Sequence, residues 1–377
     1  MRTALCDEFG IEFPIFAFSH CRDVVAAVSK AGGLGVLGAL AFSNDQLEVE
    51  LAWIDEHVEG RPYGVDVVMP ASSAGAGLGG PDLAAQLDAM IPEGHRQYVE
   101  EVLDRHGVPP LPAGVPRPRG LLGWTDQGAR SQVEVAMAHP IRLLVSALGP
   151  PPADVVARCR ERGIRVAALV GSADHARKQV EAGVDLIVAS GTEAGGHTGE
   201  ISTIVLVPEV VDAVHPVPVL AAGGIGDGRQ VAAVLALGAQ GAWTGSIWLT
   251  TTESDVSPIV MDKLLKAGSR DTVRSRALTG KPARQLRTPW TDAWDDPKGP
   301  GPLPMPLQFM LTAEAQTRIG RSGNPALAGS PVGQIVGRMN RVRSTRDVIF
   351  DLVEGAVAAV ERLNEQTNAA PSRTGGG

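Results

Sequence analysis

The sequence predicts an α/β protein that folds as a (β/α)8 TIM barrel, and three observations support this fold class. Short runs of Val, Ile, Leu and Ala alternate with amphipathic stretches, as is typical of parallel strands that are buried on both faces and joined by helices. Eight such runs occur, which favours a closed barrel over an open doubly wound sheet. Glycine clusters follow the last three runs, where the loops of a barrel usually carry its chemistry.

Each expected strand is a short apolar run that is followed by a turn or a helix. The strands are expected at residues 14–18, 35–38, 63–68, 142–146, 166–170, 186–189, 219–222 and 242–247. The helices are expected at residues 22–30, 43–57, 94–106, 131–138, 154–163, 174–183, 203–214, 228–237 and 344–365. Ser43 and Ser172 are expected N-caps, because a serine hydroxyl can accept from the free backbone N–H groups of a first helical turn.

Two regions depart from the alternation of strands and helices. Residues 71–130 form an insertion after the third strand, which we expect to lie on the barrel face as a lid or an interface. After the eighth strand the chain becomes irregular. We therefore predict a barrel over residues 1–285, a C-terminal extension over residues 286–366 that packs on it, and a disordered tail over residues 367–377.

Composition and charge argue against several classes of protein. With 44% hydrophobic residues, the chain of 377 residues has enough apolar surface to fold, so extended disorder is excluded. The net charge of −8 argues against nucleic acid or an anionic membrane as a partner. Three scattered cysteines indicate reduced thiols and no metal site, and no apolar leader is visible, so we expect a cytoplasmic protein.

The glycines after the seventh and eighth strands predict a phosphate site. Gly223 and Gly224 follow one strand, and Gly245 and Ser246 follow the next. Small residues let backbone N–H groups approach phosphate oxygens, and the loops after these two strands commonly hold a phosphate in barrels. The alternative is that both loops are simply tight turns.

The loop after the sixth strand contains the candidate catalytic residue, His197. Glycines flank this histidine in the segment GGHTG at 195–199, and they leave the imidazole unshielded. A histidine can take or give a proton near neutral pH. The alternative is a loop histidine that is satisfied by a backbone carbonyl. Glu193, in the same loop, is expected to accept from loop amides rather than to act as an acid.

Several segments resemble one known family. EAGGHTG at 193–199, PVLAAGGIGDGRQVAAVLALGAQGAWTGS at 218–246 and TGKPAR at 279–284 together resemble the nitronate monooxygenase family, formerly called 2-nitropropane dioxygenase. Members of this family bind FMN in a TIM barrel. Weaker or shorter matches are KAGGLGVLGA at 30–39, YGVDVV at 63–68 and an echo at 328–334. The resemblance implies an oxidoreductase with FMN as its cofactor.

The resemblance also implies roles for individual residues. His197 matches the family's catalytic histidine, which in some members takes the α-proton of a nitroalkane. The FMN phosphate would be held by the glycines after the last two strands, and the flavin ring would lie against the ends of other strands. The cofactor-binding residues implied in this way are Ala17, Phe18, Ser19, Asp66, Ser190, Gly195, Gly196, Gly223, Gly224, Trp243, Thr244, Gly245 and Ser246.

The chain departs from the family pattern in the expected pocket. Asp66 stands where the family usually has Asn, and an anionic Asp can accept a hydrogen bond from the flavin but cannot donate one. Ser190 stands where the family often has Gln, which has a longer reach. His20 and Cys21 replace a Gly- and Met-rich end of the first strand, so His20 can enter the substrate pocket, whereas Cys21 is expected to pack in a helix.

We therefore expect an FMN-dependent oxidoreductase that oxidises nitronates or nitroalkanes with O2 to a carbonyl compound and nitrite. One alternative keeps FMN but uses NAD(P)H to reduce a quinone or an enoyl thioester. Another alternative is a phosphate-binding aldolase or isomerase, for which neither a strand-end lysine nor metal-ligand spacing is apparent. The sequence leaves the oligomeric state open.

Overall fold

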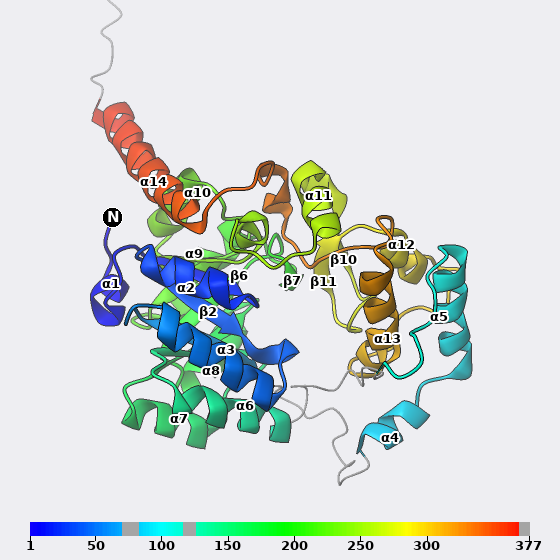
Figure 1. Ribbon diagram of the computed structural model, residues 1–377. Coiled ribbons are helices and arrows are strands. Elements are labelled where there is room, and N and C mark those ends of the chain that lie inside the picture. Colours follow the sequence, from blue (N-terminus) through cyan, green and yellow to red (C-terminus); the bar gives the residue numbers. More distant parts are fainter. Residues whose placement is uncertain (70–82, 116–125, 369–377) are drawn as a thin grey trace, which may run out of the picture.

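A computed structural model describes residues 1–69, 83–115 and 126–368, and it confirms the closed parallel barrel (Figure 1). The eight strands close in the order β1-β2-β3-β4-β5-β6-β8-β9. They are β1 (Ile15–Ser19), β2 (Leu34–Gly38), β3 (Tyr63–Val68), β4 (Leu143–Ala147), β5 (Arg165–Val170), β6 (Leu186–Ser190), β8 (Val219–Ala222) and β9 (Gly241–Thr244). The predicted extent of the last strand was wrong, since β9 ends at Thr244 and the chain then turns into the short 3-10 helix η2 (Ser246–Thr250).

Helices surround the barrel and follow the expected order. They are α1 (Ala4–Phe9), α2 (Arg22–Lys30), α3 (Asn44–His57), α6 (Asp126–Ala138), α7 (Ala153–Glu161), α8 (Ala173–Glu181), α9 (Thr203–Val214) and α10 (Gly228–Ala236), with the 3-10 turn η1 (Ala39–Ala41) after β2. The two predicted serine caps are confirmed. The Ser43 hydroxyl accepts from the backbone N–H of Gln46, and the Ser172 hydroxyl accepts from that of His175.

Side chains along each strand alternate between two cores. Inward residues such as Phe16, Val36 and Val188 fill the barrel, which α1 closes at the N-terminal ends of the strands through Leu5 and Phe9. The outward residues of the same strands pack against the surrounding helices. The N-terminal end of the barrel is therefore filled, and the C-terminal ends of the strands are left as the place for a site.

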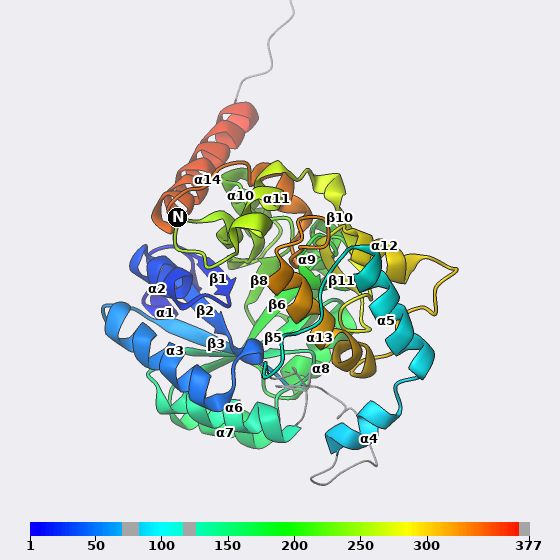
Figure 2. The same ribbon diagram turned by 45° about the vertical axis from the view of Figure 1, so that its right-hand side comes forward.

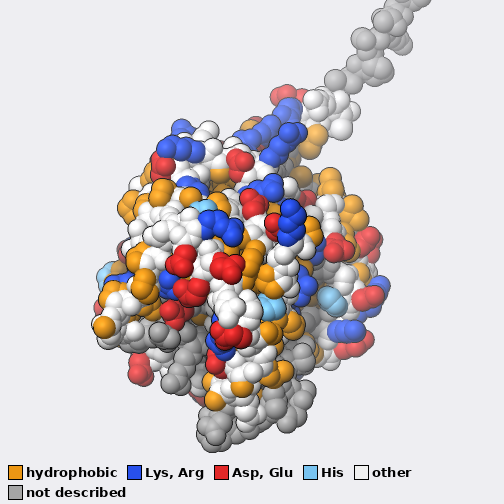
Figure 3. Space-filling view, turned by 90° about the vertical axis from the view of Figure 1, so that its right-hand side faces the viewer, with side chains coloured by type: hydrophobic (Ala, Val, Ile, Leu, Met, Phe, Trp, Pro, Cys, Tyr) orange, Lys and Arg blue, Asp and Glu red, His pale blue; other side chains and the backbone are white. Residues whose placement is uncertain are grey.

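The insertion and the extension meet in a second group of elements beside the barrel (Figure 2). Helix α5 of the insertion packs on α13 of the extension, and the buried Arg318 guanidinium donates to the Glu100 carboxylate at 2.8 Å. Acidic and basic side chains are interspersed over the face that these elements present (Figure 3). The helices of the group are α4 (Leu83–Ala89), α5 (Glu93–Arg105), α12 (Pro289–Asp295) and α13 (Leu307–Ser322). The chain between β9 and α12 forms α11 (Pro258–Lys266), η3 (Ser269–Asp271), β10 (Thr272–Ser275) and β11 (Ala283–Leu286).

Some expectations fall outside the described residues. These are the parts of the insertion at 71–82 and 116–125 and the end of the expected tail at 369–377. Residues 367 and 368 are the last two of α14 (Thr345–Asn368), a helix that runs slightly beyond its expected end. Among the described helices, none is both long enough and apolar enough to cross a membrane.

Helix α14 returns the extension to the barrel by packing along α10. The two helices are in close contact at Gly228 of α10 and Gly355 of α14. A Cβ atom added to Gly228 would lie 2.3 Å from the backbone nitrogen of Ala356 and 2.5 Å from the Cα atom of Gly355. Because backbone atoms cannot rotate aside as a side chain can, the contact requires glycine at position 228.

Gly228→Ala should therefore lower the melting temperature by about 1–4 °C, because overpacking against backbone costs about 1–3 kcal/mol. Differential scanning calorimetry would measure the shift. Gly320→Ala is a matched control, because Gly320 lies within α13 and an added Cβ would meet nothing within 4 Å. Equal melting temperatures for the two variants would contradict the proposed close contact.

Candidate functional site

The C-terminal ends of the strands form the floor of the candidate site. Alternation along β1, β3, β6 and β9 turns Phe18, Asp66, Ser190 and Trp243 toward the barrel interior. The rings of Phe18 and Trp243 lie 6.3 Å apart and are inclined by 29°, so they form one apolar surface. Four residues that the sequence assigned to cofactor binding thus share this inner layer.

The side chains of Ala17 and Thr244 face away from the barrel interior. Ala17 packs in the core between strands and helices. The Thr244 hydroxyl donates to the Phe16 carbonyl and accepts from the Trp248 indole N–H, each at 3.1 Å. Strand alternation leaves only the backbone atoms of these two residues for a ligand.

The tips of β8 and β9 present backbone donors without partners. Gly223 and Gly224 have φ values of +102° and +67°, a region that favours glycine. In the described chain, the backbone N–H groups of Gly224, Gly245 and Ser246 donate to no other residue. A Cβ added to Gly245 would meet nothing closer than 4.0 Å, so the space above these donors is open. Free backbone N–H groups in an open loop are suited to an anion such as a phosphate.

Residues 332–334 of the C-terminal extension also contact the candidate site. In the sequence they were only part of a weak family match at 328–334. The Gly333 N–H donates to the Ser246 hydroxyl at 2.8 Å, which leaves the serine hydrogen for another acceptor. The Gln334 N–H, at the start of η4 (Gln334–Arg338), donates to the Glu193 carbonyl at 2.9 Å. A Cβ added to Gly195 would lie 2.8 Å from Val332. The small residues at 328–334 indicated close packing, but the sequence did not indicate that they pack on the loops after β6 and β9.

His197 lies in β7 (Gly196–His197), a short strand that pairs with β11 in a three-stranded sheet beside the barrel. Its Nε2 atom is 2.8 Å from the Thr279 hydroxyl, which belongs to the TGKPAR segment. Burial, together with the nearby positive charge of Lys281, lowers the pKa of His197 to about 4. The imidazole is therefore neutral at neutral pH and can accept a proton. The sequence showed Thr279 only as the first residue of the TGKPAR match and did not indicate a role for it.

Glu193 has the structural role expected from the sequence. Its carboxylate accepts from both the backbone N–H and the hydroxyl of Thr203, at 3.0 and 2.8 Å. These bonds tie the loop after β6 to the start of α9. Gly196, in the same loop, has φ +78° and nothing within 4 Å of an added Cβ, so it stays open to a ligand.

His20 lies exposed at the end of β1, whereas Cys21 is buried as expected. The Nδ1–H of His20 donates to the Gly38 carbonyl at 2.8 Å, and the ring packs edge-on against Phe18. The Cys21 thiol donates to the Glu253 carbonyl at 3.2 Å. His20 is therefore available at the mouth of the site, and Cys21 is occupied in packing.

Two polar side chains of the inner layer have no partner within the described chain. Asp66 is 5% exposed and Ser190 is 8% exposed, and neither side chain makes a hydrogen bond to a described residue. Burial raises the pKa of Asp66 to about 7. The polar atoms of both side chains are not fully enclosed, so a ligand at the strand ends could reach them and bond to them. These groups and the N–H donors of β8 and β9 together fit a ligand with an anionic end and a polar ring edge, as FMN has.

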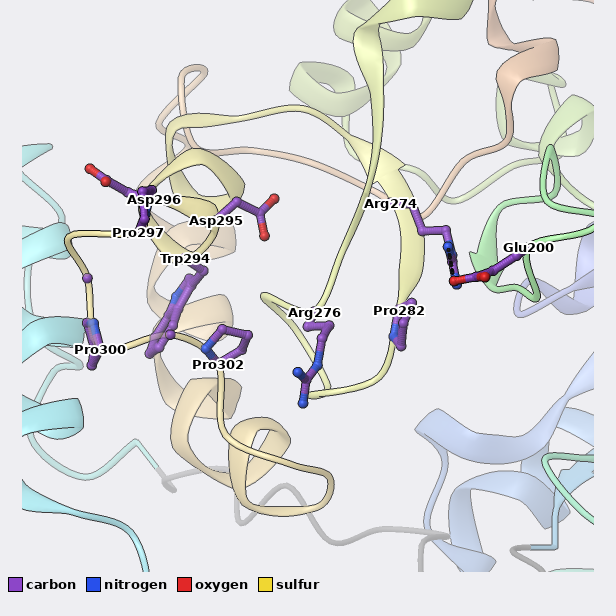
Figure 4. A pocket seen from close by; sticks show the side chains of 12 residues that line it. Glu200, Arg274, Arg276, Pro282, Trp294, Asp295, Asp296, Pro297, Pro300 and Pro302 are labelled. Carbon is purple, nitrogen blue, oxygen red and sulfur yellow. Dashed lines mark hydrogen bonds and ion pairs between the residues drawn. The ribbon is translucent and has the colours of Figure 1, made fainter.

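A second cavity, of about 510 Å³, lies against β10 and α12 (Figure 4). Arg274 and Glu200 face each other across one end of it, at 3.4 Å. Trp294 and Arg276 also line it. Its lining includes none of the residues assigned to cofactor binding or catalysis, so it is distinct from the site at the strand ends.

A closed parallel barrel with a site at its strand ends is typical of TIM-barrel enzymes, and comparison with known proteins identifies the family, which is one of flavin-dependent oxidoreductases. The family model for nitronate monooxygenase matches residues 2–355. The chain therefore belongs to the nitronate monooxygenase family.

Individual relatives agree with this assignment over almost their whole length. A Mycobacterium tuberculosis protein named "Putative monooxygenase" is 57% identical, over 96% of this chain and 98% of the relative. A "Probable nitronate monooxygenase" of Staphylococcus saprophyticus is 29% identical, over 86% of this chain and 89% of the relative. The solved structure of a nitroalkane oxidase from Streptomyces ansochromogenes superposes with a TM-score of 0.78 at 27% identity, covering 96% of this chain and all of that one.

Asp66→Asn should stabilise the ligand-free protein most at alkaline pH. The pKa of Asp66 is higher in the folded protein than in the unfolded chain, so the folded state binds more protons between the two pKa values and loses stability as the pH rises from about 4 to about 7. An amide avoids this loss and should raise the unfolding free energy by about 2–4 kcal/mol at pH 8 and by less at pH 5. Urea unfolding at the two pH values measures the difference, and an equal effect at both would show that Asp66 does not titrate as described.

Proposed function

We propose that the protein is an FMN-dependent oxidoreductase that oxidises nitronates, and less readily neutral nitroalkanes, with O2 to a carbonyl compound and nitrite. The observation that carries this proposal is the occurrence of free backbone donors at the tips of β8 and β9 beside a half-buried, neutral His197 in the neighbouring loop after β6. The family assignment and the names of two relatives support the same reaction.

The strand ends supply what FMN binding requires. The backbone N–H groups of Gly224, Gly245 and Ser246 would hold the phosphate, and the Ser246 hydroxyl would add a further donor. Phe18 and Trp243 would provide an apolar surface for the flavin ring. When bound, FMN would supply the redox chemistry by taking electrons from the substrate and passing them to O2.

His197 and its neighbours would orient the substrate and handle its proton. The Thr279 hydroxyl at Nε2 fixes the orientation of the imidazole. Lys281 lowers the pKa of His197 and contributes positive charge that attracts an anionic nitronate. A pKa of about 4 makes His197 a weak base. This weakness places nitronates, which have already lost the α-proton, ahead of neutral nitroalkanes as substrates.

Oxygen consumption tests the proposed reaction. FMN-loaded protein should consume O2 with propionate-3-nitronate and, more slowly, with 2-nitropropane. His197→Asn should lose about 100-fold or more in turnover on 2-nitropropane but less than about tenfold on the nitronate, because a general base contributes about 10²–10⁴-fold only where a proton must be removed.

His175→Asn is the matched control, because His175 is an exposed histidine on α8. It should behave as the wild type on both substrates. Equal losses in His197→Asn on both substrates would show that the residue is not the base, and the absence of O2 uptake by the loaded wild type would refute the proposed reaction. Rapid anaerobic reduction of the flavin by NADH or NADPH would instead favour the alternative of a quinone or enoyl-thioester reductase.

Gly224→Val should abolish FMN binding, because a branched side chain would crowd the N–H groups proposed to meet the phosphate. Gly163→Val is a matched control, since Gly163 has the same φ of +67° and lies in the turn between α7 and β5, at the opposite end of the barrel. Both variants carry the same backbone strain. Only Gly224→Val should lose the flavin absorbance after FMN loading and gel filtration, and unchanged FMN affinity would place the phosphate elsewhere.

A further inference from the structure

Asp66 is a buried ionisable group that the proposed reaction leaves without a task. It lies near the end of β3, opposite Gly38 of β2 and Val145 of β4, and its side chain faces the barrel interior. Its carboxyl group makes no hydrogen bond to any residue of the described chain. The floor around it is formed by the rings of Phe18 and Trp243 and by aliphatic side chains.

Among the residues that the structure describes, no charged group compensates a carboxylate at this position. The neighbouring elements β2, β4 and η1 carry no ionisable residue. The described charged side chains of α2 and α6 pair with other helices or loops. These pairs are Arg22 with Glu50, Lys30 with Glu59, Arg130 with Asp154 and Glu134 with Arg158. Asp23, also on α2, is half exposed beside Arg22. Of the ionisable groups near the mouth of the site, His20, His197 and Lys281, none shifts the pKa of Asp66, which responds to burial alone.

Ligand binding makes the charged form of this group still less favourable. A ring seated on the barrel floor removes the remaining water from Asp66, and a phosphate-bearing ligand adds negative charge to the same end of the barrel. A protonated carboxyl group avoids both costs. It also offers one O–H donor, which an anionic carboxylate lacks.

We propose that Asp66 is a cofactor-binding residue that acts as a neutral carboxylic acid, donating its proton in a hydrogen bond to an acceptor atom of FMN, so that the cofactor binds together with a proton. This inference rests on the proposed function, since it takes FMN as the ligand. It reverses the expectation from the sequence, where an anionic Asp66 could only accept. Asn at this position would serve as a donor at every pH, and Asp serves only while it is protonated.

The sign of the pH dependence follows from linkage. The neutral form binds, so the pKa of Asp66 is higher in the complex than in the ligand-free protein, where it is about 7. FMN affinity is therefore constant below pH 7 and falls above it, by about tenfold between pH 6 and pH 8. At pH 8 the carboxyl group is mostly ionised before binding, so FMN should bind with uptake of about one proton.

Two measurements on the full-length apoprotein test the inference without using enzyme activity. Quenching of FMN fluorescence gives the dissociation constant at pH 6 and pH 8 for the wild type, for Asp66→Asn and for Asp174→Asn, an exposed carboxylate on α8 that serves as the control. Calorimetry in buffers of different ionisation enthalpy gives the protons taken up at pH 8. Ionisation of the FMN phosphate, with a pKa of about 6, affects all three proteins alike and cancels in the comparison.

From pH 6 to pH 8, the FMN affinity of the wild type and of Asp174→Asn should fall about tenfold more than that of Asp66→Asn. At pH 8 the wild type and Asp174→Asn should take up about one proton on binding FMN, and Asp66→Asn should not. The inference would be overturned if FMN affinity had the same pH dependence in all three proteins. It would also be overturned if the wild-type affinity rose with pH relative to that of Asp66→Asn. Either result would leave the proposed function standing. If Asp66→Asn does not fold, the absence of proton uptake by the wild type at pH 8 would overturn it. Failure of every variant and the wild type to bind FMN would overturn both proposals.

Discussion

The candidate site depends on backbone packing directly against backbone at glycine. Gly195 lies so close to Val332 and Gly333 that a Cβ atom there would overlap the facing chain. The same constraint joins α10 to α14 at Gly228. These contacts bring the C-terminal extension onto the barrel, and the extension in turn donates to the Ser246 hydroxyl beside the proposed phosphate site. Larger side chains at these glycines would separate the two parts of the site.

Burial, rather than ion pairing, sets the charge of the two central titratable groups. His197 and Asp66 both lie in surroundings that disfavour their charged forms, so burial lowers the pKa of the base and raises the pKa of the acid. Both groups are consequently neutral over a wider range of pH than in water. A neutral site at the strand ends suits a flat aromatic ring, and the negative charge of a phosphate is left to the free N–H groups of the β8 and β9 tips.

The sequence was sufficient for the barrel because each strand is a continuous apolar run, and the glycines at 223–224 and 245 marked the loops that carry free donors. It could not assign side-chain direction at single positions. Ala17 and Thr244 belong to the right strand ends but face the helices, because a shift of one residue reverses the face of a strand. It also could not reveal that residues 332–334 reach the site, since contacts between distant segments leave no periodic pattern.

The position of Gly333 in the chain has a consequence for biosynthesis. The eight barrel strands are complete at Thr244, but the hydrogen bond to Ser246 needs a residue that is translated almost ninety positions later. During synthesis on the ribosome, the nascent barrel therefore exists for a period in which the loops after β6 and β9 lack their covering segment. Such long-range closure is slow compared with local folding. A nascent chain should thus complete the proposed cofactor-holding end only after residues 332–334 have left the ribosome.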